Sequence, residues 1–288
     1  MAFFSPFARQ LFPRFGPGHA QTLAKQHPLA VAQSLLEGFD VNVSLFQAAS
    51  ALDANSRWQE VIADNLASSS VPGFKQQQLS LAAVQAGLMP AHGEKNLPQF
   101  FSVPKASTTT NFSAGEMKYT GNNRDVAIEG KGFFEVQLPN GKTALTRDGE
   151  FQFNSQGELV TKESYPVMGI NGPIQLNRNS SAPLSIASNG EVSQGSEPRG
   201  KLKVTEVDQP KLLTQISGGY FVAQDPNLHM QASTANLREG YLEGANTSAV
   251  GEMANLMTAM RGFEANQKVI QIQDDRLNRI ISDLGNPS

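Results

Sequence analysis

The final segment of this 288-residue chain carries a heptad pattern that needs a partner helix. Alternating steps of four and three residues from position 249 meet eleven positions, of which nine are apolar. The positions are Ala249, Met253, Leu256, Met260, Phe263, Gln267, Ile270, Asp274, Leu277, Ile281 and Leu284. A narrow seam sustained over about five repeats predicts a coiled-coil-type helix packed against another helix. The polar residues Gln267 and Asp274 weaken the seam but can set its register.

The partner helix is expected at the other end of the chain, over residues 41–66. Its apolar positions, at helical spacings of three and four, are Leu45, Ala48, Leu52, Ile62 and Leu66. A serine run at 68–70, followed by Pro72 and Gly73, ends the helix. Trp58 lies off this stripe and either anchors an interface or packs against the segment that follows. We expect the two terminal helices to pair with each other.

The middle of the chain has the pattern of strands. Residues 112–235 contain short runs rich in Val, Ile, Phe and Thr, separated by turn dipeptides. These dipeptides are Asn140–Gly141, Asp148–Gly149, Asn171–Gly172, Asn189–Gly190 and Gly218–Gly219. Asn140–Gly141 predicts a hairpin between runs at 133–138 and 143–147. Residues 76–111 are ambiguous, with a possible helix around 79–86 among glycines and prolines, and are interpreted as a connector.

These patterns predict an α+β fold, in which N- and C-terminal helices pair as a coiled-coil-like layer beside a central all-β domain. The expected parts are a leader at 1–40, a helix and turn at 41–75, the connector at 76–111, the β domain at 112–235 and the heptad helix at 236–288. The leader is rich in Phe and has no acidic residue before Glu37. It is interpreted as a disordered tail, a transit peptide or a segment outside the native product, with Val41 as the expected start.

Composition excludes several classes of function. The net charge of −3 lacks the basic footprint of nucleic-acid binding. The absence of cysteine excludes disulfides, thiolate catalysis and Cys-ligated metals. The sequence contains no run of about 18 apolar residues, so no transmembrane helix is predicted.

No catalytic, cofactor-binding or metal-ligating constellation is apparent. The four histidines lack the spacing of a zinc site. They are His19, His27, His92 and His229. The glycines at 130 and 132 lead into an apolar run instead of a helix, which excludes a dinucleotide loop. Asp274 and Asp275 point about 100° apart on a helix, so they cannot act as an acid–base pair. We therefore expect no enzyme activity and no cofactor.

Four groups of motifs resemble the rod and hook proteins of the flagellar basal body, the axial family of the bacterial flagellum. The first group is ASALDA at 49–54, VIADNLA at 61–67 and PGFK at 72–75. The second is TGN at 120–122 and DVAIEGKGFF at 125–134. The third is TRDGEF at 146–151, GELV at 157–160 and YPV at 165–167. The fourth is GYLEGAN at 240–246, EM at 252–253, MR at 260–261, FE at 263–264 and Asn266.

The resemblance implies a non-enzymatic structural subunit of the rod, which crosses the periplasm as a self-assembling helical tube and transmits torque. It implies that the terminal helices assemble with other copies and with other rod and hook subunits. It further implies delivery by the flagellar export apparatus without a cleaved signal, and no membrane insertion. The residues expected at the assembly interface are Leu45, Leu52, Trp58, Ile62, Leu66, Met253, Leu256, Met260, Phe263, Ile270, Leu277, Ile281 and Leu284.

Four alternatives accompany this interpretation: a distal rod subunit, a hook-type subunit, an enzyme and an unrelated binding protein. A proximal rod subunit is favoured over a distal one, and a hook-type subunit is the nearest sibling, although the compact β segment lacks the large insertions of hook subunits. A wall-cutting enzyme would need a positioned carboxylate pair, which the sequence does not offer. A secreted binding protein with a β head and coiled-coil stalk would form a closed dimer or trimer, whereas a rod subunit should stay monomeric when dilute.

Overall fold

The structure, a computed structural model, describes residues 28–89, 99–178, 180, 182–225 and 228–285. The chain divides into two compact units. The first unit comprises Met1–Asp53, Ala83–Lys105 and Phe263–Ser288, and the second comprises Ala54–Ala82 and Ala106–Gly262. Both terminal helices therefore contribute to both units.

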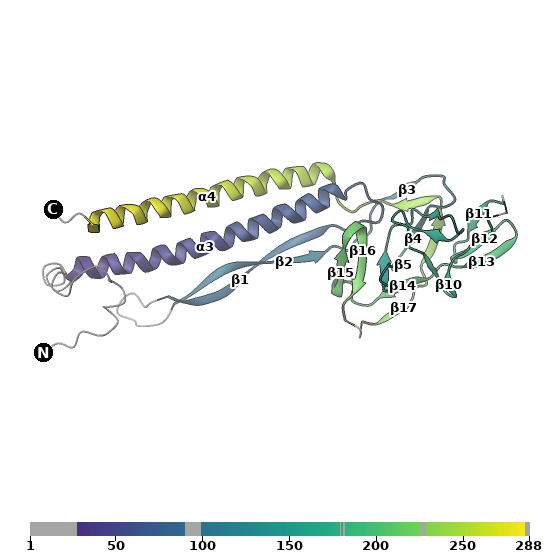
Figure 1. The fold of residues 1–288 in the computed structure, drawn as a ribbon, viewed down its shortest axis with the longest axis horizontal. Coiled ribbons are helices and arrows are strands. Elements are labelled where there is room, and N and C mark those ends of the chain that lie inside the picture. The colour runs from purple at the N-terminus through teal and green to yellow at the C-terminus, as the bar shows by residue number, and fades with distance from the viewer. Residues whose placement is uncertain (1–27, 90–98, 179, 181, 226–227, 286–288) are drawn as a thin grey trace. The chain divides into compact units, whose positions relative to one another are not determined.

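Two long helices near the ends of the chain confirm the predicted helix–β–helix order (Figure 1). Helix α3 spans Pro28–Ala67 and helix α4 spans Ala249–Gly285. Helix α3 begins earlier than the expected residue 41, at a proline, which favours the first turn because its fixed φ suits a helix. Residues 28–40, expected in the leader, are helical, and residues 1–27 lie outside the described part. No helix in the described ranges is long and apolar enough to cross a membrane.

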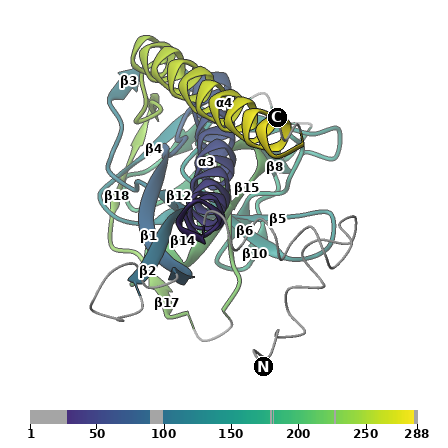
Figure 2. The same ribbon diagram turned by 90° about the vertical axis from the view of Figure 1, so that its left-hand side faces the viewer.

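The region interpreted as a connector forms a β ribbon, so the possible helix at 79–86 was wrong. Strand β1 (Gln77–Met89) pairs with β2 (Gln99–Thr110), and the two run side by side in both ribbon views (Figure 1, Figure 2). The backbone N–H of Asn111 donates to the carbonyl of Gln76 at 2.8 Å, and Thr109 Oγ1 donates to the carbonyl of Gln78 at 3.5 Å. These pairs set an antiparallel register at the base of the ribbon.

The second unit contains the central β domain. Its strands are β3 (Met117–Tyr119), β4 (Val126–Glu129), β5 (Phe133–Gln137), β6 (Thr143–Thr146), β7 (Gln152–Phe153), β8 (Leu159–Val160), β9 (Met168–Gly169), β10 (Gly172–Pro173), β11 (Leu184–Ile186), β12 (Glu191–Gln194), β13 (Glu197–Lys201), β14 (Val204–Val207), β15 (Leu213–Ile216), β16 (Tyr220–Ala223), β17 (Met230–Ala232), β18 (Asn236–Glu239) and β19 (Tyr241–Glu243). Two 3₁₀ turns, Pro210–Leu212 and Ser217–Gly219, flank β15. The last two strands fall inside the range 236–288 expected as helix, whereas α4 itself begins at Ala249, where the heptad count starts.

The largest sheet has six strands in the order β15-β16-β6-β5-β14-β17. The predicted hairpin is confirmed, since β5 and β6 pair antiparallel around Asn140–Gly141. Three further turn dipeptides also join antiparallel neighbours: β9 with β10, β11 with β12, and β15 with β16. The strand β18 pairs with β4, and β19 pairs with β3, so the chain returns to the start of the domain just before α4.

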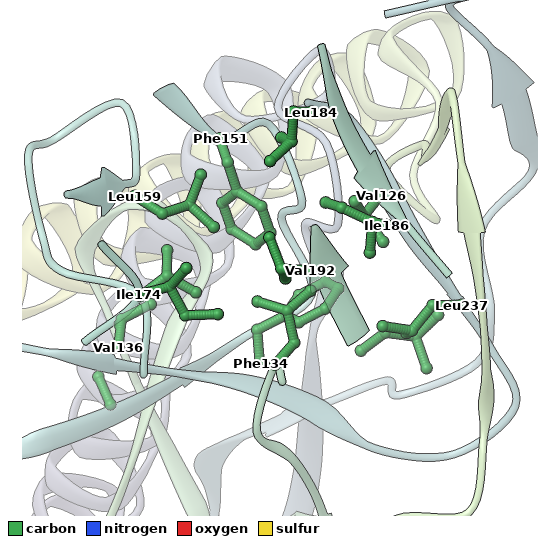
Figure 3. Packing of buried hydrophobic residues seen from close by; sticks show 14 of the residues in the cluster. Val126, Phe134, Val136, Phe151, Leu159, Ile174, Leu184, Ile186, Val192 and Leu237 are labelled. Atoms are coloured by element: carbon green, nitrogen blue, oxygen red, sulfur yellow. The ribbon is translucent and has the colours of Figure 1, made fainter. Parts of the chain in front are cut away.

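The β domain has two apolar clusters because β5 presents successive side chains to opposite faces. Phe134 joins the larger cluster, where its ring meets Phe151 edge to face with centroids 5.1 Å apart (Figure 3). Phe133 joins the smaller cluster with Phe221 and Leu145. Each fully buried Phe contributes about 1.5–3 kcal/mol of transfer free energy, so this domain carries its own core.

Candidate assembly surface and its junction with the β domain

One narrow face of helix α4 is covered by the rest of the chain, and its other faces are exposed. From Glu252 onward the covered positions, apart from Gly262, repeat at steps of four and three, and we call this repeating set the inner seam. They are Glu252, Leu256, Ala259, Phe263, Asn266, Ile270, Gln273, Leu277 and Ile280. Only Glu252 and Ala259 are fully buried among the side chains described in this helix. Such a heptad seam is the geometry of a helix packed against one partner.

The inner seam corrects the predicted seam at every second position. Both seams share Leu256, Phe263, Ile270 and Leu277, which are half-buried. The other predicted apolar positions, Met253, Met260 and Ile281, are exposed to 53%, 51% and 66%. In each case the residue one position earlier is covered instead: Glu252, Ala259 and Ile280. Glu252 is buried because its carboxylate accepts hydrogen bonds, which are described below. The side chain of Leu284 lies outside the described residues.

A second apolar face of α4 is open. Val250, Met253, Met257 and Met260 stand at steps of three, four and three, so they share one side of the helix. Their exposed fractions are 78%, 53%, 58% and 51%. We call these four residues the methionine stripe. They belong to the second unit, and the free chain leaves them in water.

The predicted interface residues of α3 lie on its covered side. Ile62 is buried, and Leu45, Leu52, Trp58 and Leu66 are half-buried. Near the end of this helix, Gly262 of α4 approaches closely, because a Cβ on Gly262 would lie 3.3 Å from the side-chain amide of Asn55. The α3 residues are therefore covered within the chain, unlike the methionine stripe.

The turn after α3 docks onto the β domain through a glycine. Gly73 has φ of +68°, and a Cβ there would lie 2.3 Å from the carbonyl carbon of Arg147. Its N–H donates to the carbonyl of Glu243 at 2.6 Å. Only glycine combines this left-handed conformation with such a close backbone approach. The turn thereby touches both the β domain and the strand that leads to α4.

A buried ionic cluster lies directly behind this turn. Lys75 Nζ donates to Glu243 Oε1 at 2.6 Å and to the carbonyl of Ser113 at 2.8 Å. Arg147 Nη1 donates to Glu243 Oε2 at 3.0 Å, and its Nη2 donates to the carbonyl of Gly130 at 2.7 Å. The side chains of Lys75 and Glu243 are each 1% exposed. One carboxylate thus serves two cations in a site closed to water.

Burial dominates the protonation energetics of the cluster. Desolvation lowers the pKa of Lys75 and of Arg147, and the hydrogen bonds and charge of Glu243 oppose that shift in both. Without Glu243 the two cations would be buried unpaired, which is strongly unfavourable. Glu243 is therefore the residue on which the other two depend.

Amide side chains extend the junction to both helices. Asn65, near the end of α3, exchanges two hydrogen bonds with the backbone of Gln77 at 2.8 and 2.9 Å. Asn246 accepts from the N–H of Gln76 at 2.6 Å, and the Gln76 side chain donates to Glu252 Oε1, also at 2.6 Å. Thr247 Oγ1 donates to the same Glu252 oxygen at 2.9 Å. These bonds explain why a charged residue occupies the first buried position of α4.

A second buried carboxyl lies next to this turn. Burial raises the pKa of Asp148 to about 7, although the N–H of Glu150 donates to its Oδ1 at 2.9 Å. Burial also raises the pKa of Tyr220, whose hydroxyl donates to Glu163. The backbone N–H of Asp148 would lie 2.4 Å from a Cβ on Gly73, so this carboxyl belongs to the same junction.

Sequence reasoning quoted the junction residues as parts of motifs but assigned them no contact. Lys75 and Glu243 are separated by 168 residues, and no local pattern predicts such a pair. A usable signal was that charged or amide residues recur close to glycines in PGFK, TRDGEF and GYLEGAN. All three motifs meet at this cluster. Within the described residues, no group of three or more acids and histidines could hold a metal ion.

Three families match separate parts of the chain. "Flagella basal body rod protein" matches residues 47–75, "Flagellar hook protein FlgE/F/G D1 domain" matches 127–194, and "Flagellar basal body rod FlgEFG protein C-terminal" matches 238–283. These ranges cover the C-terminal part of α3, a part of the β domain and nearly all of α4.

Similar proteins align over most of the chain. The flagellar basal-body rod protein FlgG of Buchnera aphidicola (subsp. Schizaphis graminum) is 31% identical over 261 residues, which is 82% of this chain and 98% of the relative. The rod protein FlgF of Escherichia coli K12 is 30% identical over 83% of this chain and 98% of its own length. FlgG of Borreliella burgdorferi is 30% identical over 81% of this chain and 96% of its own length.

Proposed function

This chain belongs to the flagellar basal-body rod protein family, and we propose that the methionine stripe on α4 is the surface through which it contacts a neighbouring subunit. As a member it is a structural rod subunit of the flagellar basal body. Its partners are other rod and hook subunits. The observation that supports the proposal is a row of four apolar side chains, all at least half exposed.

The chemistry of the stripe suits a contact between subunits. Exposed apolar rows on soluble proteins mark interaction sites, and methionine adapts its shape to an irregular partner. A tube built by a screw operation needs a heterologous contact, in which one surface of a subunit meets a different surface of the next. The methionine stripe supplies one such surface, and its burial in the assembly provides the driving force.

The inner seam has a complementary role in this proposal. Leu256, Phe263, Ile270 and Leu277, with the covered residues of α3, hold the terminal helices together as the layer that carries the stripe. The earlier interface set thus separates into two functions, one within the subunit and one between subunits. Ile281 is exposed and remains in the proposed intersubunit group.

The finer features of the function are also proposals. The chain acts as a building block without catalysis, without cofactors, without nucleic acid and without membrane insertion. The flagellar export apparatus delivers it without a cleaved signal peptide, and a proximal rod position is favoured. Family membership and the absence of a catalytic constellation in the sequence support this interpretation.

The test compares two single substitutions on exposed parts of α4. Met257→Glu places a charge in the centre of the methionine stripe, whereas Thr258→Glu places the same charge on an exposed position that is not three or four residues from any stripe residue. Both variants keep a good helix former. The proposal expects Met257→Glu to abolish swimming and leave rods incomplete in electron micrographs of basal bodies, with a monomer that folds normally by circular dichroism.

Thr258→Glu should assemble complete rods and swim. Normal rods in Met257→Glu cells would contradict the assignment of the stripe as the contact surface. Equal loss in both variants would show that any added charge on α4 blocks assembly, which also contradicts a specific stripe.

A further inference from the structure

The buried ionic cluster contains two cations that pair with the same carboxylate, Glu243. Lys75, Arg147 and Glu243 give the site a net charge of +1, and the two cations reach the two oxygens of the same carboxylate. The Nε of Arg147 is buried without a hydrogen-bond partner, so the guanidinium has no spare stabilisation. Removal of the carboxylate would raise the buried charge to +2.

The three residues come from three parts of the chain. Lys75 belongs to the turn after α3, Arg147 follows β6, and Glu243 ends β19 just before α4. The turn cannot bury Lys75 stably until β19 has brought Glu243 into place, because a buried unpaired cation is costly. Conversely, the carbonyl of Glu243 and the amide of Asn246 bond to the turn itself. Docking of either terminal segment therefore favours docking of the other.

We infer that Glu243 is a latch that couples the two terminal segments, so that the end of α3 and the start of α4 are fixed on the β domain together or not at all. Through this latch the end of α3 and the start of α4 form one cooperative unit with the β domain. This inference concerns the single chain and does not depend on how subunits meet.

The charges of the cluster predict that Lys75 can be replaced by an uncharged residue. In Lys75→Met, Glu243 Oε1 still accepts from the N–H of Gly115 at 2.8 Å, and the carbonyl of Ser113 still accepts from Asn246 Nδ2 at 3.0 Å. Methionine is close in volume to the lysine stem, and the remaining Arg147–Glu243 pair is balanced. Loss of one cation should therefore be tolerated, since replacing buried ions by apolar groups is often neutral.

Glu243→Gln should behave in the opposite way. It keeps the size of the side chain but leaves two buried cations without a counter-charge. The double variant Lys75→Met/Glu243→Gln returns the site to the wild-type net charge of +1, with Arg147 still bonded to backbone carbonyls. Lys75→Met should therefore rescue Glu243→Gln.

Hydrogen exchange measured by mass spectrometry on the full-length monomer tests the latch. The reporters are the amides of residues 61–67 in α3 and 252–259 in α4, with β5 and β6 as the internal reference. We expect Glu243→Gln to accelerate exchange at both helix ends together, by roughly a hundredfold, while β5 and β6 stay protected. Lys75→Met should remain within about threefold of wild type, and the double variant should recover part of the protection that Glu243→Gln loses, since one buried unpaired cation remains in place of two.

Glu129→Gln is the matched control, since Glu129 forms an exposed ion pair with Arg238 in the same domain and should change little. The inference is overturned if only one helix end loses protection, or if Lys75→Met worsens Glu243→Gln. If Glu243→Gln alone fails to fold, a folded double variant supports the latch and an unfolded one contradicts it. Failure of the latch would leave the methionine stripe unaffected, because assembly is not measured in this experiment.

Discussion

The β domain and helix α4 satisfy their apolar side chains in different ways. In the β domain, Phe134, Phe151 and Phe221 are at most 1% exposed. In α4, the described side chains include only two that are fully buried, whereas Val250 and Met257 exceed 55% exposure. A region with a complete core folds by itself, and a region with a single seam leaves burial to be completed by neighbours. The junction around Glu243 joins these two kinds of structure.

The largest expected effect tests how firmly the junction is buried. The pKa of Asp148 is raised to about 7 in the folded chain against 3.8 in the unfolded chain, so folding takes up a proton between these values. Stability should therefore be highest below pH 4 with respect to this group, fall as the pH rises to about 7, and then level off. The loss approaches roughly 4 kcal/mol if the full shift is realised.

Urea unfolding of wild type and Asp148→Asn at pH 5 and pH 8 measures this effect. The asparagine variant can still accept the N–H of Glu150, and its midpoint should change less between the two pH values. Identical pH dependence in both proteins would show that Asp148 titrates normally and that the junction admits water.

The next effect separates close backbone approach from backbone conformation. Gly73→Ala should lower the free energy of unfolding by roughly 2–4 kcal/mol, because the new Cβ combines a φ of +68° with a clash against the backbone of Arg147. Gly141→Ala has a similar φ of +77° but nothing within 4 Å, so about 1 kcal/mol is expected. Chemical denaturation followed by circular dichroism gives both values. Equal losses would mean that the turn does not touch the β domain.

The smallest effect compares two neighbours on α4. Leu256→Ala removes a half-buried side chain of the inner seam and should lower the local stability of the helix by roughly 1–2 kcal/mol. Met257→Ala removes an exposed side chain and should change monomer stability by less than about 0.5 kcal/mol. Hydrogen exchange in residues 252–262 provides the measurement. A larger loss in Met257→Ala would place the covered face of α4 on the methionine side.

Local patterns predicted the parts of this fold that local physics determines. The Asn140–Gly141 hairpin follows from turn geometry, and α4 begins at Ala249 as counted. The seam register was offset at alternate positions because the count followed apolar residues, while Glu252, Asn266 and Gln273 occupy seam positions. Burial of Glu252 depends on Gln76, which is 176 residues distant. The ribbon β1–β2 was missed because Gly87 and Pro104 in its strands, together with Pro90, Gly93 and Pro98 between them, are typical of a loop.

The same distinction applies to the candidate site. The methionine-rich face could be read from the sequence, but whether it faced inward or outward depended on which seam the fold selects. The ionic cluster required the fold itself, because Lys75, Arg147 and Glu243 are far apart along the chain and meet only through β-strand pairing.

The most direct test of the central claim uses the absence of cysteine from this chain. Met257→Cys and Thr258→Cys each introduce one unique thiol, and a short heterobifunctional photo-crosslinker attached to it in cells or in isolated basal bodies reports what lies beside α4. The methionine-stripe account predicts crosslinks from position 257 to another axial subunit, and few from position 258. Crosslinks from position 258 with none from position 257 would contradict it.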